Sequence, residues 1–229
     1  MQVIAIASQK GGAGKSTLAV NLALLANRKG APALLIDTDP QASLTFWRSL
    51  RGLETPVLVP CRPNELPEVL DSAERNGIEW VFIDGPPHSR DDIGDLMRAA
   101  DLVVIPTRPT AFDLASVAAT IEMARSLNRP FLVVLNAVPP KRGIADAAVV
   151  TEARRIIEEL DAPVWRGSIS QRAPYAQAIA SGQSVTEFDP DSIAAQEMRH
   201  LWRDLNRTTA AIAQLKLART PAVPDKISA

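Results

Sequence analysis

The stretch Ser8-Gln9-Lys10-Gly11-Gly12-Ala13-Gly14-Lys15-Ser16-Thr17 decides the fold of this chain. The apolar run Val3-Ile4-Ala5-Ile6-Ala7 precedes it and predicts a buried strand. Leu18, Leu22 and Leu25 follow it at helical spacing and predict a helix. A glycine-rich turn between a strand and a helix indicates a phosphate-binding loop. The glycines let backbone N–H groups approach a polyphosphate, and the start of the helix adds a partial positive charge.

The residues of this loop suit a nucleoside triphosphate together with a magnesium ion. Lys15 is placed to reach the β- and γ-phosphates, and the Ser16 hydroxyl is placed to ligate Mg²⁺. The pattern G-x-x-x-x-G-K-[ST] is only partly matched, because Gln9 stands at its first glycine. A flexible surface loop is the alternative, and the register of strand, glycines, lysine, hydroxyl and helix disfavours it. The predicted nucleotide cradle consists of Lys10, Gly11, Gly12, Ala13, Gly14, Lys15, Ser16 and Thr17.

The segment from Lys10 to Ser16 resembles the deviant Walker A loop, K-G-G-x-G-K-[ST], of the ParA/MinD family of ATPases, in its ParA-like branch. The resemblance implies a P-loop NTPase fold, ATP and Mg²⁺ as cofactors, and a homodimer that closes around ATP. It also implies that Lys10 reaches across the dimer interface to the nucleotide of the partner subunit. Further stretches of the same kind extend the resemblance to about residue 205.

Three acidic residues follow apolar runs that predict strands. Asp84 ends the run 80–83, a Walker B pattern whose carboxylate holds Mg²⁺ through water. Asp37 and Asp39 follow the run 33–36, and their alternative role is to cap a helix or a turn before Pro40. The form Asp-x-Asp-Pro-Gln is typical of ParA-like proteins. It implies that Asp39 positions or activates the attacking water near Mg²⁺ and that Asp37 belongs to the outer shell of the metal. Lys10, Lys15 and Asp39 form the predicted catalytic set.

Further apolar runs separated by helical patterns predict an α/β fold, with a doubly wound, mainly parallel sheet and helices on both faces. Strands are expected at 57–59, 102–106, 131–135 and 164–169. Asn136 ends one of them, and its amide suits the donor and acceptor edge of adenine. The family resemblance gives that position the same role in base recognition. Arg108 follows another strand, and the sequence leaves open whether it faces a partner, the nucleotide or solvent. His88 is predicted to be an ordinary loop residue.

Length and composition bound the class of protein. The 229 residues suit one ATPase domain over 1–219, and the proline-containing tail 220–229 is expected to be unstructured. The net charge of −1 argues against a surface covered by nucleic acid, but it allows a local basic patch. The single cysteine rules out an internal disulfide and fits a reducing compartment. Without a signal peptide or an apolar run of about 20 residues, a cytoplasmic location is expected.

A basic helix face is predicted near the end of the chain. The region 191–217 is predicted to form one helix or two joined helices, and Arg199, Arg203 and Arg207 fall at i, i+4 and i+8. A solvated helix face is the alternative explanation. The family resemblance instead implies contacts to non-specific DNA, for which Arg172, Arg199 and Arg203 are the candidate residues.

The resemblance thus implies an ATP-dependent dimerising switch. Its ATP-bound dimer binds nucleoid DNA, and a ParB-like or cargo-adaptor protein stimulates slow hydrolysis, so that a plasmid, chromosome region or protein assembly is positioned. One rival is a MinD-like membrane-associated positioning ATPase. The segment 208–219 contains no aromatic residue and offers only a thin apolar face, so no stable membrane association is expected. The other rival is an ATP-dependent metabolic ligase or synthetase on the same fold.

Overall fold

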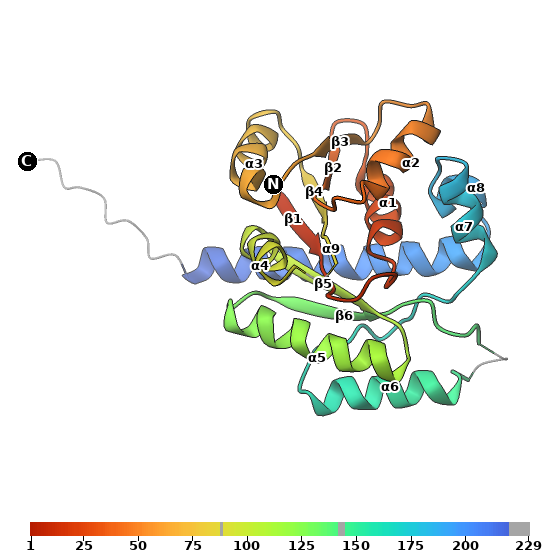
Figure 1. Cartoon of the computed structure of the whole chain (residues 1–229). Coiled ribbons are helices and arrows are strands. Elements are labelled where there is room, and N and C mark those ends of the chain that lie inside the picture. Colours follow the sequence, from red (N-terminus) through yellow and green to blue (C-terminus); the bar gives the residue numbers. More distant parts are fainter. Residues whose placement is uncertain (88, 142–144, 220–229) are drawn as a thin grey trace, which may run out of the picture.

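A six-stranded sheet forms the centre of the structure, a computed structural model that describes residues 1–87, 89–141 and 145–219 (Figure 1). Every pairing in the sheet is parallel, and the strand order is β3-β2-β4-β1-β5-β6. The predicted doubly wound parallel architecture is therefore confirmed. The strands are β1 (Gln2–Ile6), β2 (Ala33–Asp37), β3 (Val57–Pro60), β4 (Trp80–Asp84), β5 (Leu102–Thr107) and β6 (Phe131–Leu135).

Alternation of side chains along each strand divides the core between the two faces of the sheet. Val3 and Ala5 of β1 belong to one hydrophobic cluster, whereas Ile4 and Ile6 belong to the other. Helices cover both faces, so side chains of both orientations are buried in the central strands. This double burial is why the strands read as continuous apolar runs rather than as alternating patterns.

The helices divide between the two faces according to which cluster their apolar side chains join (Figure 1). Among the described residues, no helix is long and apolar enough to cross a membrane. One face is covered by α1 (Lys15–Ala26), α2 (Ser43–Arg51), α7 (Ala173–Ala180), α8 (Val185–Phe188) and α9 (Ile193–Arg219). The other is covered by α3 (Leu66–Arg75), which follows the short 3₁₀ helix η1 (Pro63–Glu65), and by α4 (Arg90–Ala99), α5 (Ala111–Ser126) and α6 (Ala148–Glu159).

The long helix α9 is one continuous helix of 27 residues. It is anchored to the sheet by Trp202, whose ring meets that of Trp80 edge-on at 4.7 Å and lies 5.9 Å from that of Phe82. Near the carboxyl end of α9, the Lys216 ammonium pairs with Asp101, a residue that directly precedes β5. Aromatic packing and an ion pair therefore fix the helix to the sheet at two separate points.

The prediction of a strand at 164–169 is wrong. The segment makes only isolated bridges, from Val164 to Val133 and from Ser170 to Val138. Arg154 of α6 explains the interruption, because its guanidinium donates hydrogen bonds to the carbonyls of residues 165, 166 and 167. Those carbonyls are thus bound to a side chain instead of to a neighbouring strand. The predictions for His88 and for the tail 220–229 lie outside the described residues.

Candidate functional site

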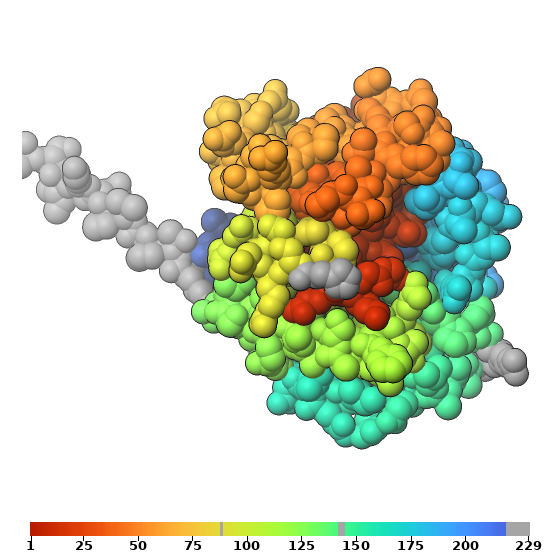
Figure 2. Space-filling model, viewed as in Figure 1, coloured from red at the N-terminus to blue at the C-terminus, as the bar shows by residue number. Residues whose placement is uncertain are grey.

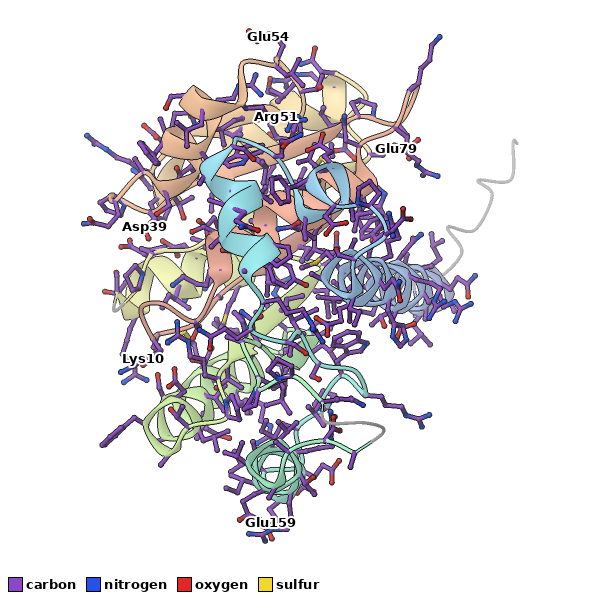
Figure 3. The ribbon with its side chains drawn as sticks, turned by 90° about the vertical axis from the view of Figure 1, so that its right-hand side faces the viewer. Lys10, Asp39, Arg51, Glu54, Glu79 and Glu159 are labelled. Carbon is purple, nitrogen blue, oxygen red and sulfur yellow. The ribbon has the colours of Figure 1, made fainter. Side chains whose placement is uncertain are left out.

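The predicted site residues meet at the edge of the sheet where its parallel strands end. Ligands of open α/β sheets bind at this edge, because loops from several strands converge there. The strand register pairs Asp84 with both Ile6 and Asp37, so the loops after β1, β2 and β4 begin side by side. Lys10 and Asp39 lie on the same side of the molecule in Figure 3.

The loop between β1 and α1 has the backbone expected of an anion cradle. Gly12 and Gly14 take positive φ values of 72° and 91°, which glycine adopts without strain. Gly14 is the N-cap of α1, and within the described chain no side chain caps this helix. The first N–H groups of α1 are therefore available to an anion, whose charge the helix dipole also favours.

Two clefts adjoin the loop and share Gly12, Gly14 and Arg108 in their walls. A cleft of about 740 Å³ contains Lys15, Ser16 and Asp39, and it is the candidate phosphate and metal side. A second cleft of about 680 Å³ contains Asn136, Gln171, Arg172 and Met198, and it is the candidate side for the base and sugar. In Figure 2 the red N-terminal segment reaches the surface between the yellow and green segments.

The carboxylate of Asp84 is fully buried, and neither of its oxygens has a hydrogen-bond partner among the described residues. Burial raises the pKa of Asp84 to about 7, while the nearby Ser16 hydroxyl and Lys15 ammonium act in the opposite direction. An unpartnered buried carboxylate beside a serine hydroxyl fits a magnesium ion, whose charge would stabilise the ionised form. The described residues hold no cluster of three or more His, Cys, Asp or Glu suited to a metal. Water and phosphate oxygens would therefore supply most ligands, as is usual for Mg²⁺.

Lys15 lies at the start of α1 with only 6% of its surface exposed. Burial lowers the pKa of its ammonium group, and the carboxylates of Asp84 and Asp39 raise it. A buried cation at the first turn of a helix, beside the loop glycines, is placed to neutralise phosphate charge. The role of Lys15 toward the nucleotide stays a prediction.

The two aspartates after β2 have different surroundings. Asp37 is buried, and its Oδ2 accepts hydrogen bonds from the Thr45 N–H at 3.0 Å and from the Thr45 hydroxyl at 3.1 Å. Asp37 thus holds the start of α2, which corresponds to the alternative capping role considered from the sequence. Asp39 is half-buried, accepts a hydrogen bond from the Gln41 N–H at 2.9 Å and lines the phosphate cleft.

Asn136 and Arg108 both contact the phosphate loop. The Asn136 amide donates a hydrogen bond to the Ala13 carbonyl at 2.7 Å, and the Arg108 guanidinium donates one to the Gly12 carbonyl. The sequence assigned no role to Arg108, although it follows β5 directly and so lies where the loops of a parallel sheet converge. Its place directly after a predicted strand could therefore have indicated a role of Arg108 at the site.

The three arginines proposed to contact DNA are not equivalent. Arg172 pairs with Glu197 at 3.4 Å and lies in the wall of the second cleft. Arg199 and Arg203 are exposed on α9; the first donates a hydrogen bond to the Pro190 carbonyl at 2.7 Å. Arg203 and Asp204 form a loose ion pair at 3.8 Å. The outer face of α9 therefore carries the accessible positive charge, whereas Arg172 is largely engaged within the protein.

The sheet and its glycine-rich loop define a P-loop nucleotide-binding protein. Residues 4–185 match the model of the CobQ/CobB/MinD/ParA nucleotide binding domain. The chain belongs to this family and is a ParA/MinD-type ATPase. It is 31% identical over 193 residues to the maintenance of carboxysome distribution protein A of Halothiobacillus neapolitanus, covering 81% of this chain and 87% of that protein. It is also 31% identical to the chromosome-partitioning ATPase Soj of Thermus thermophilus, covering 86% and 92% of the two chains.

Solved structures share the same fold. Apo McdA of Cyanothece superposes with a TM-score of 0.71 at 22% identity, covering 87% of this chain and 97% of that one. A chain of the MinC:MinD cell division protein complex of Aquifex aeolicus gives a TM-score of 0.73 at 19% identity, covering 90% of this chain and 95% of that one. At these identities the superpositions establish the architecture.

Proposed function

We propose that this ATPase is an ATP-dependent dimerising switch that partitions or positions a cellular cargo on nucleoid DNA. The observation that carries the proposal is the second lysine of the phosphate loop, Lys10, in a chain whose relatives act in carboxysome distribution and chromosome partitioning. A ParB-like or cargo-adaptor protein would stimulate hydrolysis and release the dimer. The names of the relatives favour this function over the metabolic ligases and the membrane-associated rival considered from the sequence.

Exposed aromatic side chains on α2 and α5 support a face that meets a second subunit. Phe112, on the first turn of α5, is 83% exposed, and Phe46 of α2 is 66% exposed while lining both clefts. Aromatic side chains are enriched at protein–protein interfaces relative to the rest of a protein surface. Lys10 lies on the phosphate loop that adjoins both clefts, and it forms no ion pair with the acidic residues of the described chain.

The Lys10→Ala variant is expected to remain monomeric in ATP and Mg²⁺ while it still binds ATP. Lys10 would act on the nucleotide of the partner subunit, whereas Lys15 serves the nucleotide of its own subunit. Light scattering coupled to size exclusion measures the mass, and a fluorescent ATP analogue measures binding. Lys29→Ala, at an exposed lysine just beyond the other end of α1, is the matched control. An unchanged dimer in Lys10→Ala would refute the trans role.

The double variant Arg199→Glu/Arg203→Glu is expected to weaken ATP-dependent binding to non-specific DNA by about tenfold or more. The two arginines lie one helical turn apart on the exposed face of α9, so they can contact neighbouring phosphates. The dependence of the binding constant on salt should also become shallower, because fewer counterions are released. Retention on DNA is measured over a salt series, with Arg75→Glu on α3 as the control. If the double variant and the control were retained on DNA equally, this face of α9 would not be the DNA-binding surface.

A further inference from the structure

Two successive peptide units of the phosphate loop are held by side chains from elsewhere at the sheet edge. Arg108, which follows β5, donates a hydrogen bond to the Gly12 carbonyl, and Asn136, which follows β6, donates one to the Ala13 carbonyl. These residues are 96 and 123 positions from their partners along the chain. The loop after β1 is thus tied to the ends of the two strands that continue the sheet on one side of β1.

Holding a carbonyl also fixes the N–H of the same peptide unit. In a trans peptide the C=O and N–H groups point in opposite directions. The carbonyl held by Arg108 belongs to the unit that carries the Ala13 N–H, and the carbonyl held by Asn136 belongs to the unit that carries the Gly14 N–H. Each N–H therefore points away from the side chain that holds its carbonyl. Within the described part of the chain, neither N–H donates to another backbone carbonyl, so both are available to an anion.

Gly14 is fitted to this arrangement. A Cβ atom at Gly14 would lie 2.2 Å from Asn136 Nδ2, and Gly14 has a φ of 91°. Asn136 is only 7% exposed and has little room to withdraw. The glycine thus permits the close approach through which the amide reaches the loop. The sequence pattern predicts this glycine, whereas the contact that requires it became visible only in three dimensions.

We propose that Arg108 and Asn136 are positioning residues that hold the phosphate loop in its anion-binding conformation, whatever base the nucleotide carries. The inference goes beyond the proposed function, because it concerns binding by a single subunit without DNA. Without these two contacts the peptide units have more conformational freedom, and ordering them on binding costs affinity. Recognition of adenine by Asn136, the role expected from the sequence, makes a different prediction: only binding of adenine nucleotides would weaken.

The test compares ATP with inorganic tripolyphosphate, which carries no base. Asn136→Leu keeps the approximate shape of the side chain, adds no charge and removes the donor. The dissociation constants of both ligands are expected to rise by the same factor, roughly threefold to tenfold for the loss of one hydrogen bond. Isothermal titration calorimetry with Mg²⁺ present measures both constants. An unchanged constant for tripolyphosphate beside a raised constant for ATP would overturn the proposal and assign Asn136 to the base.

Arg108 provides an independent arm of the experiment, because it is exposed and its replacement is easily tolerated by the fold. Arg108→Met should weaken both ligands in equal proportion, and Arg108→Lys, which restores one donor, should recover affinity for both. Titrations at roughly 0.5 M salt screen the direct attraction between an exposed cation and the polyphosphate. Arg75→Met is the matched control, and the unfolding temperature without ligand should match that of the parent. Unchanged tripolyphosphate binding in Arg108→Met, or no recovery in Arg108→Lys, would overturn the proposal.

Discussion

The Lys15→Met variant is expected to bind ATP with a dissociation constant raised roughly 100-fold or more. Removing one partner of a buried charge pair has an effect of this size. The Lys15 ammonium is buried at the first turn of α1, in the wall of the cleft that also contains Ser16 and Asp39. Methionine fills a similar volume but leaves the polyphosphate charge without its buried counter-charge. Titration with a fluorescent ATP analogue in the presence of Mg²⁺ measures the dissociation constant.

Thermal unfolding separates this effect from a loss of folding. ATP binding to the parent protein should raise the unfolding temperature with increasing ATP concentration, because the ligand binds only the folded state. The Lys15→Met protein should unfold near the temperature of the ligand-free parent and show no response to ATP. Lys29→Met serves as the control at the other end of the same helix. A dissociation constant within threefold of the parent would contradict the role of Lys15.

The Asp39→Ala variant is expected to hydrolyse ATP at about one hundredth of the parental rate or below. A general base or water-positioning group usually contributes a factor of this size. Asp39 is half-buried, lines the phosphate cleft with Lys15 and Ser16, and makes its hydrogen bond to the neighbouring Gln41 N–H. Its removal leaves the loop and the lysine in place, so ATP should still bind. Under the proposed function, ATP-bound dimers should therefore accumulate. Phosphate release measures the rate, and light scattering measures the dimer.

Two further aspartates serve as comparisons for Asp39. Asp71→Ala, at an exposed position on α3, should hydrolyse ATP at the parental rate. Asp37→Ala removes the acceptor for both donors of Thr45, so it should lower the unfolding temperature as well as activity. If Asp39→Ala instead abolished ATP binding, Asp39 would belong to the nucleotide pocket rather than to the hydrolytic step.

The parallel sheet and the phosphate loop could be predicted because local patterns determine them. Buried parallel strands read as apolar runs, and the loop combines glycines, a lysine and a hydroxyl in a fixed order. The position of Asp84 followed from the Walker B pattern, in which an apolar run ends in an acidic residue. The short helix α8 could also have been predicted, although we predicted no helix there. Its capping box of Ser184 and Glu187 is visible in the sequence.

Partners in space could not be predicted, because they join distant parts of the chain. The contact of Asn136 with a base stays a prediction, but the sequence did not indicate that its amide also contacts the Ala13 carbonyl. The contact of Arg172 with DNA also stays a prediction, and the sequence did not indicate that this arginine pairs with Glu197 in the folded chain. The segment 164–169 has a strand-like composition, yet Arg154 binds its carbonyls and prevents regular pairing. In each case the partner found in the structure lies on another element, and no local sequence pattern indicates it.

The parallel direction of the strands in the sheet also determines where a label or tether can be attached without covering the phosphate loop. The first strand begins at Gln2, and the last turns of α9 are fixed beside Asp101, at the amino end of β5. Both of these points lie at the rim of the sheet opposite the phosphate loop. A fluorophore attached beside Met1, or a tether joined near the end of α9, therefore leaves the loop unobstructed. Surface immobilisation and single-molecule imaging can use these two attachment points without blocking the nucleotide.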